Sequence, residues 1–131
     1  MEELVEFFHS YVGRRPLDPA AHISLGILHS ALEDFQTAIR DFEKAGELTS
    51  KDQDAKGILD GEYYFSYAAA HERVGNIGTA EKFFLQAIDL DPTNVKAHNY
   101  LSYMRAEHNI NLDRALIHVE IALEAEPDRA D

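Results

Sequence analysis

The chain has no cysteine and no tryptophan, and its 12 lysine and arginine residues are outnumbered by 24 aspartate and glutamate residues. Without cysteine it forms no disulfide and offers neither a thiolate nucleophile nor the usual ligands of a structural zinc site. Its net charge of −12 repels phosphate backbones, so we expect no nucleic-acid partner. No stretch of 18 apolar residues occurs, which excludes a hydrophobic membrane-spanning helix.

A spacing of small and aromatic residues recurs along the chain. In the centre, Ala80, Phe84 and Ala87 are followed by Pro92. The same spacing occurs 42 residues earlier and 35 residues later, in the sets Ala38, Phe42, Ala45 and Ser50, and Ala115, Val119, Ala122 and Pro127. Periods of this size are typical of solenoids, in which each unit buries its apolar face only against its neighbours.

Apolar periodicity and helix-stop signals predict an all-α protein. The predicted helices are 2–12, 19–32, 35–48, 61–74, 78–90, 95–108 and 112–125. Asp18 before Pro19 is a typical helix start, because an aspartate caps the first turn and a proline is tolerated there. No segment alternates between polar and apolar residues as a strand would.

The two predicted helices between 61 and 90 form a close pair. Ala68, Ala80 and Ala87 are small, so the two backbones can approach, and Tyr64 and Phe84 fill the space beside them. This arrangement resembles the tetratricopeptide repeat, whose pattern is W-x2-L-G-x2-Y, then A-x3-F, then a closing proline. The resemblance implies a right-handed α-solenoid of antiparallel helix pairs, with three repeats and an N-terminal helix.

The resemblance covers nearly the whole chain and gives most of the histidines a place. Leu25 and Gly26 match the L-G pair of the pattern. Histidine stands for the tryptophan of the pattern at two positions and for its tyrosine at two others, which are His22 and His98, and His29 and His71. We therefore expect these four side chains to be packed aromatic substitutes.

We expect a single domain over 1–131. Its parts are a capping helix at 1–17, repeat 1 at 19–50, an insertion at 51–60, repeat 2 at 61–94 and repeat 3 at 95–129. The first helix is predicted to cap the stack, because Leu4 and Tyr11 are bulky where later units have alanine. The insertion is either a longer loop or an extended helix end, and both alternatives stay open.

No catalytic, metal or cofactor site is predicted. His71 is followed by Gly75 where a zincin would have its second histidine. The stretch beginning at Asp52 has the spacing of a calcium loop, but Lys56 puts a cation at a ligand position and Tyr63 replaces the bidentate glutamate. Neither a G-x-S-x-G motif nor a phosphate-binding glycine loop is present. We therefore expect a protein that is not an enzyme and needs no cofactor.

The first helices of stacked pairs line a concave face, and we expect this face to bind a protein or peptide partner. Its predicted residues follow spacings of three and four, which place each set on one side of a helix. They are Ile23, Ile27, Glu62, Phe65, Ala69, Glu72, Arg73, Lys96, Asn99 and Tyr103, and Ala106 and Glu107 continue the same side of the last of these helices. In the alternative, the N-terminal helix or the insertion covers part of the face. The predicted function is that of an adaptor or assembly scaffold.

Some members of the family hold the acidic tails of heat-shock chaperones with a clamp of lysines, asparagines and an arginine. Here Ile23, Ile27, Ser66 and Tyr100 occupy four of these positions, and only Lys96 is retained. We therefore expect an acidic chaperone tail to bind weakly.

Apolar residues after 111 spread over more than one face of the last predicted helix. Burying one face would leave others exposed, Ile117 and Ile121 among them, and such a surface is typical of an interface. The alternative function is accordingly self-association, either as a homodimer through the C-terminal helices or as an excised fragment of a longer array. The loose third repeat is similar in style to those of bacterial members.

Overall fold

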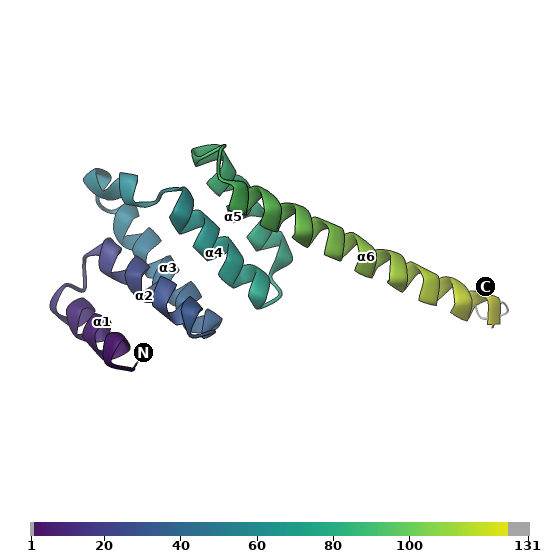
Figure 1. Ribbon diagram of the computed structural model, residues 1–131, viewed down its shortest axis with the longest axis horizontal. Helices are drawn as coiled ribbons and strands as arrows, with labels where there is room; N and C mark the ends of the chain where they lie inside the picture. The colour runs from purple at the N-terminus through teal and green to yellow at the C-terminus, as the bar shows by residue number, and fades with distance from the viewer. Residues whose placement is uncertain (1, 126–131) are drawn as a thin grey trace.

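The computed structural model describes residues 2–125, and every regular element in this range is helical (Figure 1). The elements are α1 (Glu2–Arg14), α2 (Pro19–Ala31), α3 (Phe35–Ser50), the 3-10 helix η1 (Gln53–Ile58), α4 (Gly61–Arg73), α5 (Ile77–Leu90) and α6 (Val95–Ala125). Helices α2 and α3 form one antiparallel pair, and α4 and α5 form the next. Helix α1 lies along α2 at the N-terminal end of the row (Figure 1). The predicted all-α solenoid of stacked helix pairs is confirmed.

The two helix pairs close with the same turn. Glu33 and Gly75 adopt left-handed backbone conformations, with φ of 62° and 89°. The next residue in each turn returns its N–H to the helix before it, Asp34 to the His29 carbonyl at 2.8 Å and Asn76 to the His71 carbonyl at 2.9 Å. A left-handed residue after a helix allows these bonds to form, which ends the first helix and aims the chain back along it.

Within each pair, a phenylalanine of the second helix covers a small residue of the first. A Cβ atom added to Gly26 would lie only 2.6 Å from Cε1 of Phe42. In the next pair Ala68 shares one buried cluster with Ala80 and Phe84. Phe42 and Phe84 are completely buried. The recurring spacing of the sequence is therefore the contact surface between the two helices of a pair.

Aromatic side chains join one pair to the next. The Tyr63 hydroxyl, on α4, donates a 2.6 Å hydrogen bond to the Phe42 carbonyl on α3, and the two rings lie 5.8 Å apart. Tyr67, also on α4, lies against Phe42 of α3, with the two ring centres 5.7 Å apart. Burial raises the pKa of both tyrosines, that of Tyr67 to about 12, so both hydroxyls stay protonated at neutral pH.

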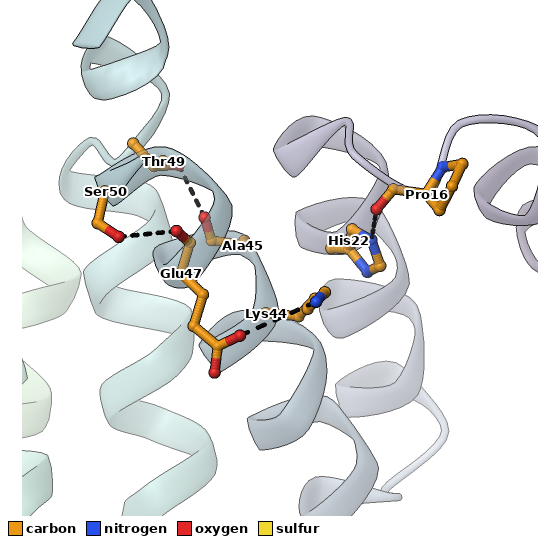
Figure 2. Close-up of polar contacts among 7 residues, drawn as sticks. All are labelled: Pro16, His22, Lys44, Ala45, Glu47, Thr49 and Ser50. Carbon is orange, nitrogen blue, oxygen red and sulfur yellow. Dashed lines mark hydrogen bonds and ion pairs between the residues drawn. The ribbon is translucent and has the colours of Figure 1, made fainter. Parts of the chain in front are cut away.

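Two histidines fasten the start of their helix to the loop before it. His22 donates from Nε2 to the Pro16 carbonyl at 2.9 Å (Figure 2), and His98 donates in the same way to the Pro92 carbonyl at 3.0 Å. His22 is buried as expected, but His98 is exposed, so the expectation that it is a packed aromatic substitute is wrong. No second helix covers its ring, because α6 does not turn back on itself as the two complete pairs do.

His29 and His71, at the tyrosine position of their units, are both buried. His29 Nδ1 lies 2.6 Å from Oδ2 of Asp41 on α3. His71 Nδ1 accepts a 3.1 Å hydrogen bond from the Asn76 amide, while its Nε2 is buried without a hydrogen-bond partner in the described part of the chain. Burial lowers the pKa of His71, although the charge of Glu43 opposes this effect.

The insertion between the first two pairs combines both alternatives that the sequence left open. Helix α3 continues to Ser50, and the hydroxyls of Thr49 and Ser50 cap its end by donating to the carbonyls of Ala45 and Glu47, each at 2.7 Å (Figure 2). The following residues form η1 before α4 begins at Gly61. Of the calcium-loop-like positions, the side chains of residues 54 and 56 lie outside the described part.

The prediction of two helices at 95–108 and 112–125 is wrong, because both segments belong to the single helix α6. The first half of α6 packs on α5 through Ala97, Leu101 and Met104, and the second half extends away from the other helices (Figure 1). The junction contains neither glycine nor proline, so every residue there can take helical geometry. The side chains of Ala115 and Ala122, and all of Pro127, lie outside the described part.

Replacing either residue at the centre of the α4–α5 contact should destabilise the fold. Phe84→Ala leaves a cavity and should cost about 3–5 kcal/mol, and Ala80→Leu overpacks the contact and should cost about 1–3 kcal/mol. Leu85→Ala, on the exposed side of the same helix, is the control. Denaturant unfolding measures all three, and equal stability of Phe84→Ala and Leu85→Ala would contradict this packing.

Acid should weaken the fold through His71. Because its pKa in the folded state is lowered, the unfolded chain takes up the proton first, and this contribution to stability is lost as pH falls through the histidine range. His71→Phe should therefore lose less free energy of unfolding between pH 7.5 and pH 5.5 than the parent. Leu85→Ala, which removes no titratable group, should keep the parent's pH dependence. Parallel curves for the parent and His71→Phe would be the opposite result.

Candidate functional site

A hollow of about 520 Å³ lies between the C-terminal end of α4 and the first half of α6. Its lining combines tyrosines with charged and amide side chains, which are Glu72, Arg73, Asn99, Tyr100, Tyr103, Met104 and Glu107. The hollow lies between the first helix of one pair and the helix that follows that pair, as expected for the concave face of a solenoid.

Helical spacing sets the α6 side of the hollow. Asn99, Tyr103 and Glu107 are four residues apart, so they lie one above another on one face of the helix. Met104 is buried beneath them in the cluster around Phe84. Tyr103 is 66% exposed, so most of its ring remains available for contact. The α6 side therefore has a fixed apolar floor and an exposed aromatic ring above it.

Two phenylalanines fix the position of Tyr100. Its ring meets that of Phe65 edge to face at 5.3 Å and lies 6.0 Å from that of Phe84. Since both phenylalanines pack into the core between α4 and α5, Tyr100 is held by the same cluster that stabilises the fold. The aromatic wall of the hollow is therefore formed before any ligand binds.

The charged side chains come from both helices. Glu72 and Arg73 lie in the last turn of α4, and Glu107 lies opposite them on α6. The Arg73 guanidinium stands 4.9 Å from the centre of the Phe35 ring, a cation–π geometry that ties it to the start of α3. The hollow thus contains two carboxylates and one guanidinium, and the guanidinium is already in contact with an aromatic face.

The structure brings four of the ten predicted concave-face residues together around the hollow, namely Glu72, Arg73, Asn99 and Tyr103, and Glu107, from the same predicted side of the last helix, joins them. The other six predicted residues do not line it. Phe65 and Ala69 pack against the cluster around Phe84, Ile23 packs against the cluster around Phe42, and Ile27, Glu62 and Lys96 are exposed elsewhere.

Tyr100 and Met104 line the hollow although the predicted face left them out. Both lie next to predicted residues, so a slightly wider helical face would have included them. The neighbouring Tyr103 and Asn99 point to the same side of α6, because positions three and four apart share a face. The missing information was how α6 is rotated on α5, which only the packing determines.

The two predicted self-association residues lie in the far half of α6. Ile117 and Ile121 are 54% and 58% exposed. Neither of them lines the hollow, whose lining on α6 ends at Glu107. The described side chains contain no group of three histidine or acidic residues arranged to hold a metal ion. Among residues 2–125, no helix combines the length and the apolar character needed to cross a bilayer.

Comparison with known proteins identifies the repeat. The family model described as tetratricopeptide repeat matches residues 61–94, the segment that forms α4 and α5. Two curated relatives from Plasmodium falciparum, both named Hsp70-Hsp90 organising protein, are 25% identical to this chain over 126 residues, or 96% of its length. The chain spans 47% of one relative and 21% of the other.

Solved structures share the fold at low identity. The first TPR of Spaghetti (RPAP3) bound to the HSP90 peptide SRMEEVD aligns with a TM-score of 0.70 and 18% identity, over 82% of this chain and 79% of that one. A MamA crystal structure aligns with a TM-score of 0.70 and 18% identity, over 98% of this chain and 66% of that one. Cut9–Hcn1 from the APC/C aligns with a TM-score of 0.73 and 21% identity, over 93% of this chain and 23% of that one.

Proposed function

The chain carries a tetratricopeptide repeat within the fold of tetratricopeptide-repeat domains, and we propose that it is a non-catalytic adaptor that binds a segment of a partner protein in the hollow between α4 and α6. Domains of this kind are protein–protein interaction modules. The observation that supports this site is the preformed aromatic wall of Tyr100 beside the exposed ring of Tyr103. Aromatic side chains that become buried on binding are those on which binding energy concentrates at protein interfaces.

The charges favour a basic partner segment. Glu72 and Glu107 face the hollow, while the nearby Arg73 is already engaged with the Phe35 ring. The chain as a whole carries a net charge of −12, which attracts cations and repels anions at long range. The segment that fits best has a lysine or arginine for the carboxylates next to an apolar side chain for the tyrosines.

The predicted concave face extends this surface beyond the hollow. Ile27 on α2 is half exposed, and Glu62 and Lys96 are exposed near the first turns of α4 and α6. An extended partner segment that enters at the tyrosines would continue along α4 towards Ile27. In this proposal Phe65 and Ala69 support the face from below, because both pack into the core.

An acidic chaperone tail is a poor match for this site. One solved relative holds the HSP90 peptide SRMEEVD, whose acidic residues need cationic partners. Of the clamp positions that the family resemblance implies, four are occupied here by Ile23, Ile27, Ser66 and Tyr100, and only Lys96 is basic. The carboxylates of the hollow would repel such a tail. The partner segment proposed for this chain is therefore basic, whereas the chaperone tail is acidic.

Self-association is a second candidate function. The observation that favours it is the exposure of Ile117 and Ile121, together with other large apolar side chains, on the far half of α6. Exposed apolar surface of this kind usually marks an interaction site. The self-association surface and the hollow occupy different parts of α6, so the two functions are compatible.

Two labelled peptides test the proposed charge preference. SRMEEVD and its counterpart SRMKKVK, in which lysines replace the acidic residues, are titrated with the chain and followed by fluorescence anisotropy. The lysine peptide should bind about tenfold more tightly, a difference of about 1.4 kcal/mol. Glu107→Lys should remove this preference, and Tyr103→Ala should weaken binding of the lysine peptide. Asp89→Lys, the same charge change on the exposed side of α5, should have no comparable effect.

The acidic peptide provides the contrary outcome. Tighter binding of SRMEEVD, abolished by Lys96→Ala, would show that a chaperone tail is the partner and that the charge argument is wrong. If neither peptide binds the parent or Tyr103→Ala at high micromolar concentration, the hollow is not a binding site for short charged segments.

A further inference from the structure

The far half of α6 exposes a row of large apolar side chains, which are Leu112, Leu116, Ile117, Val119, Ile121 and Leu123. Each is about half exposed, and this half of the helix extends beyond the packed helices (Figure 1). Such a row is much larger than the single apolar side chains that commonly occur on protein surfaces. An apolar surface of this extent usually marks an interaction site.

The repeat spacing indicates that Val119 is the side chain that corresponds to Phe42 and Phe84 in the third unit. Phe42 and Phe84 come 16 residues after Gly26 and Ala68, the small residues that they cover. Val119 comes 17 residues after Ser102, because this unit has one extra residue. Yet Val119 is 55% exposed, whereas both phenylalanines are fully buried. The third unit therefore has both halves of the same contact, but the halves are apart.

The matching surface on the first half of α6 is also uncovered. It consists of the positions that face the second helix in the two complete pairs, namely His22, Gly26 and His29 on α2, Tyr64, Ala68 and His71 on α4, and His98, Ser102 and Arg105 on α6. The α2 and α4 residues are buried or partly buried, but all three α6 residues are exposed. The absence of a covering helix is also why the His98 ring is exposed.

The junction between the two halves contains the signals of a turn. Asn109 occupies the position of Glu33 and Gly75, the left-handed residues of the first two turns. Asn111 occupies the position of Asp34 and Asn76, which precede the second helix of each pair. Asparagine tolerates the left-handed conformation and is a preferred helix cap. The segment thus encodes a hairpin but is straight in this structure.

We propose that α6 is the opened form of the third helix pair and that two copies of the chain exchange its second half. In this dimer, residues 112–125 of each copy cover Ser102 and its neighbours on the other. A straight helix of 31 residues is roughly 46 Å long and cannot fold back on itself. A second copy can supply the missing half to each chain, since antiparallel α6 helices related by a twofold axis make both contacts at once.

A second copy is the occupant because the segment that fits the surface is part of this chain. The step from Ser102 to Val119 repeats the steps that join Gly26 to Phe42 and Ala68 to Phe84. The exchange therefore continues the interface already seen in the two complete pairs. This inference specifies the second candidate function above and depends on neither the hollow nor its partner.

Cysteine cross-linking tests the exchange directly, because the chain has no cysteine of its own. Ser102→Cys and Val119→Cys chains are mixed in equal amounts and oxidised. Exchange predicts a disulfide between the two variants, seen as a covalent dimer on non-reducing gels. A mixture of Ser102→Cys with Glu120→Cys, one position round the helix, is the matched control and should cross-link far less. Equal cross-linking in both mixtures would mean a different interface.

Light scattering and a turn variant test the opened hairpin. The parent should have twice the chain mass of 14.8 kDa. Deleting Ile110 and replacing Asn109→Gly restores the spacing and the turn of the second pair, so this variant should be monomeric. Asn109→Ala should remain dimeric. A monomeric parent, or an intrachain disulfide in the Ser102→Cys, Val119→Cys double variant, would overturn the exchange.

The variant Glu107→Lys, in the hollow, distinguishes the exchange between chains from peptide binding. Glu107→Lys changes the lining of the hollow and should leave the dimer mass unchanged. Loss of peptide binding with a persistent dimer would refute only the peptide proposal, and a monomer that still binds the lysine peptide would refute only the exchange.

Discussion

The contact between a small residue and a phenylalanine determines the rest of this structure. Gly26 under Phe42 and Ala68 beside Phe84 allow two helices to approach closely, and no larger side chain fits at the first of these positions. Once the α2–α3 pair has closed, its outer surface receives the tyrosines of the next pair, including Tyr63, whose hydroxyl donates to the Phe42 carbonyl. Each pair therefore creates the surface on which the following helix packs.

The fold was predictable from the sequence in the two units where the small residue and the phenylalanine of this contact follow the repeat spacing. The Ala–Phe–Ala spacing predicted both complete pairs, and the resemblance to the repeat pattern, which puts His22 at its tryptophan position, correctly predicted that His22 is buried. The course of α6 was not predictable from spacing. The third unit encodes the same contact with Ser102 and Val119, and nothing in a spacing states whether the two residues meet in one chain or in different chains.

The candidate site was predicted only in part for a related reason. The residues of α4 and α6 on a common helical face, Arg73 and Tyr103 among them, do meet around one hollow. Phe65 was assigned to the same face, but it turns into the core to support Tyr100. The depth of a side chain depends on how one helix is rotated against the next, and that rotation comes from packing along the whole interface.

The two proposed surfaces lie on different sides of α6 and are linked by it. Tyr103 and Glu107 face α4, whereas Ser102 and Arg105 occupy the side that a second helix covers in the complete pairs, and Arg105 is joined to Glu81 of α5 at 2.7 Å. Covering that side would fix the rotation of α6 and with it the shape of the hollow. A twofold dimer would also hold two hollows at a constant separation, and a partner with two binding segments would gain affinity from the second contact without any new residue.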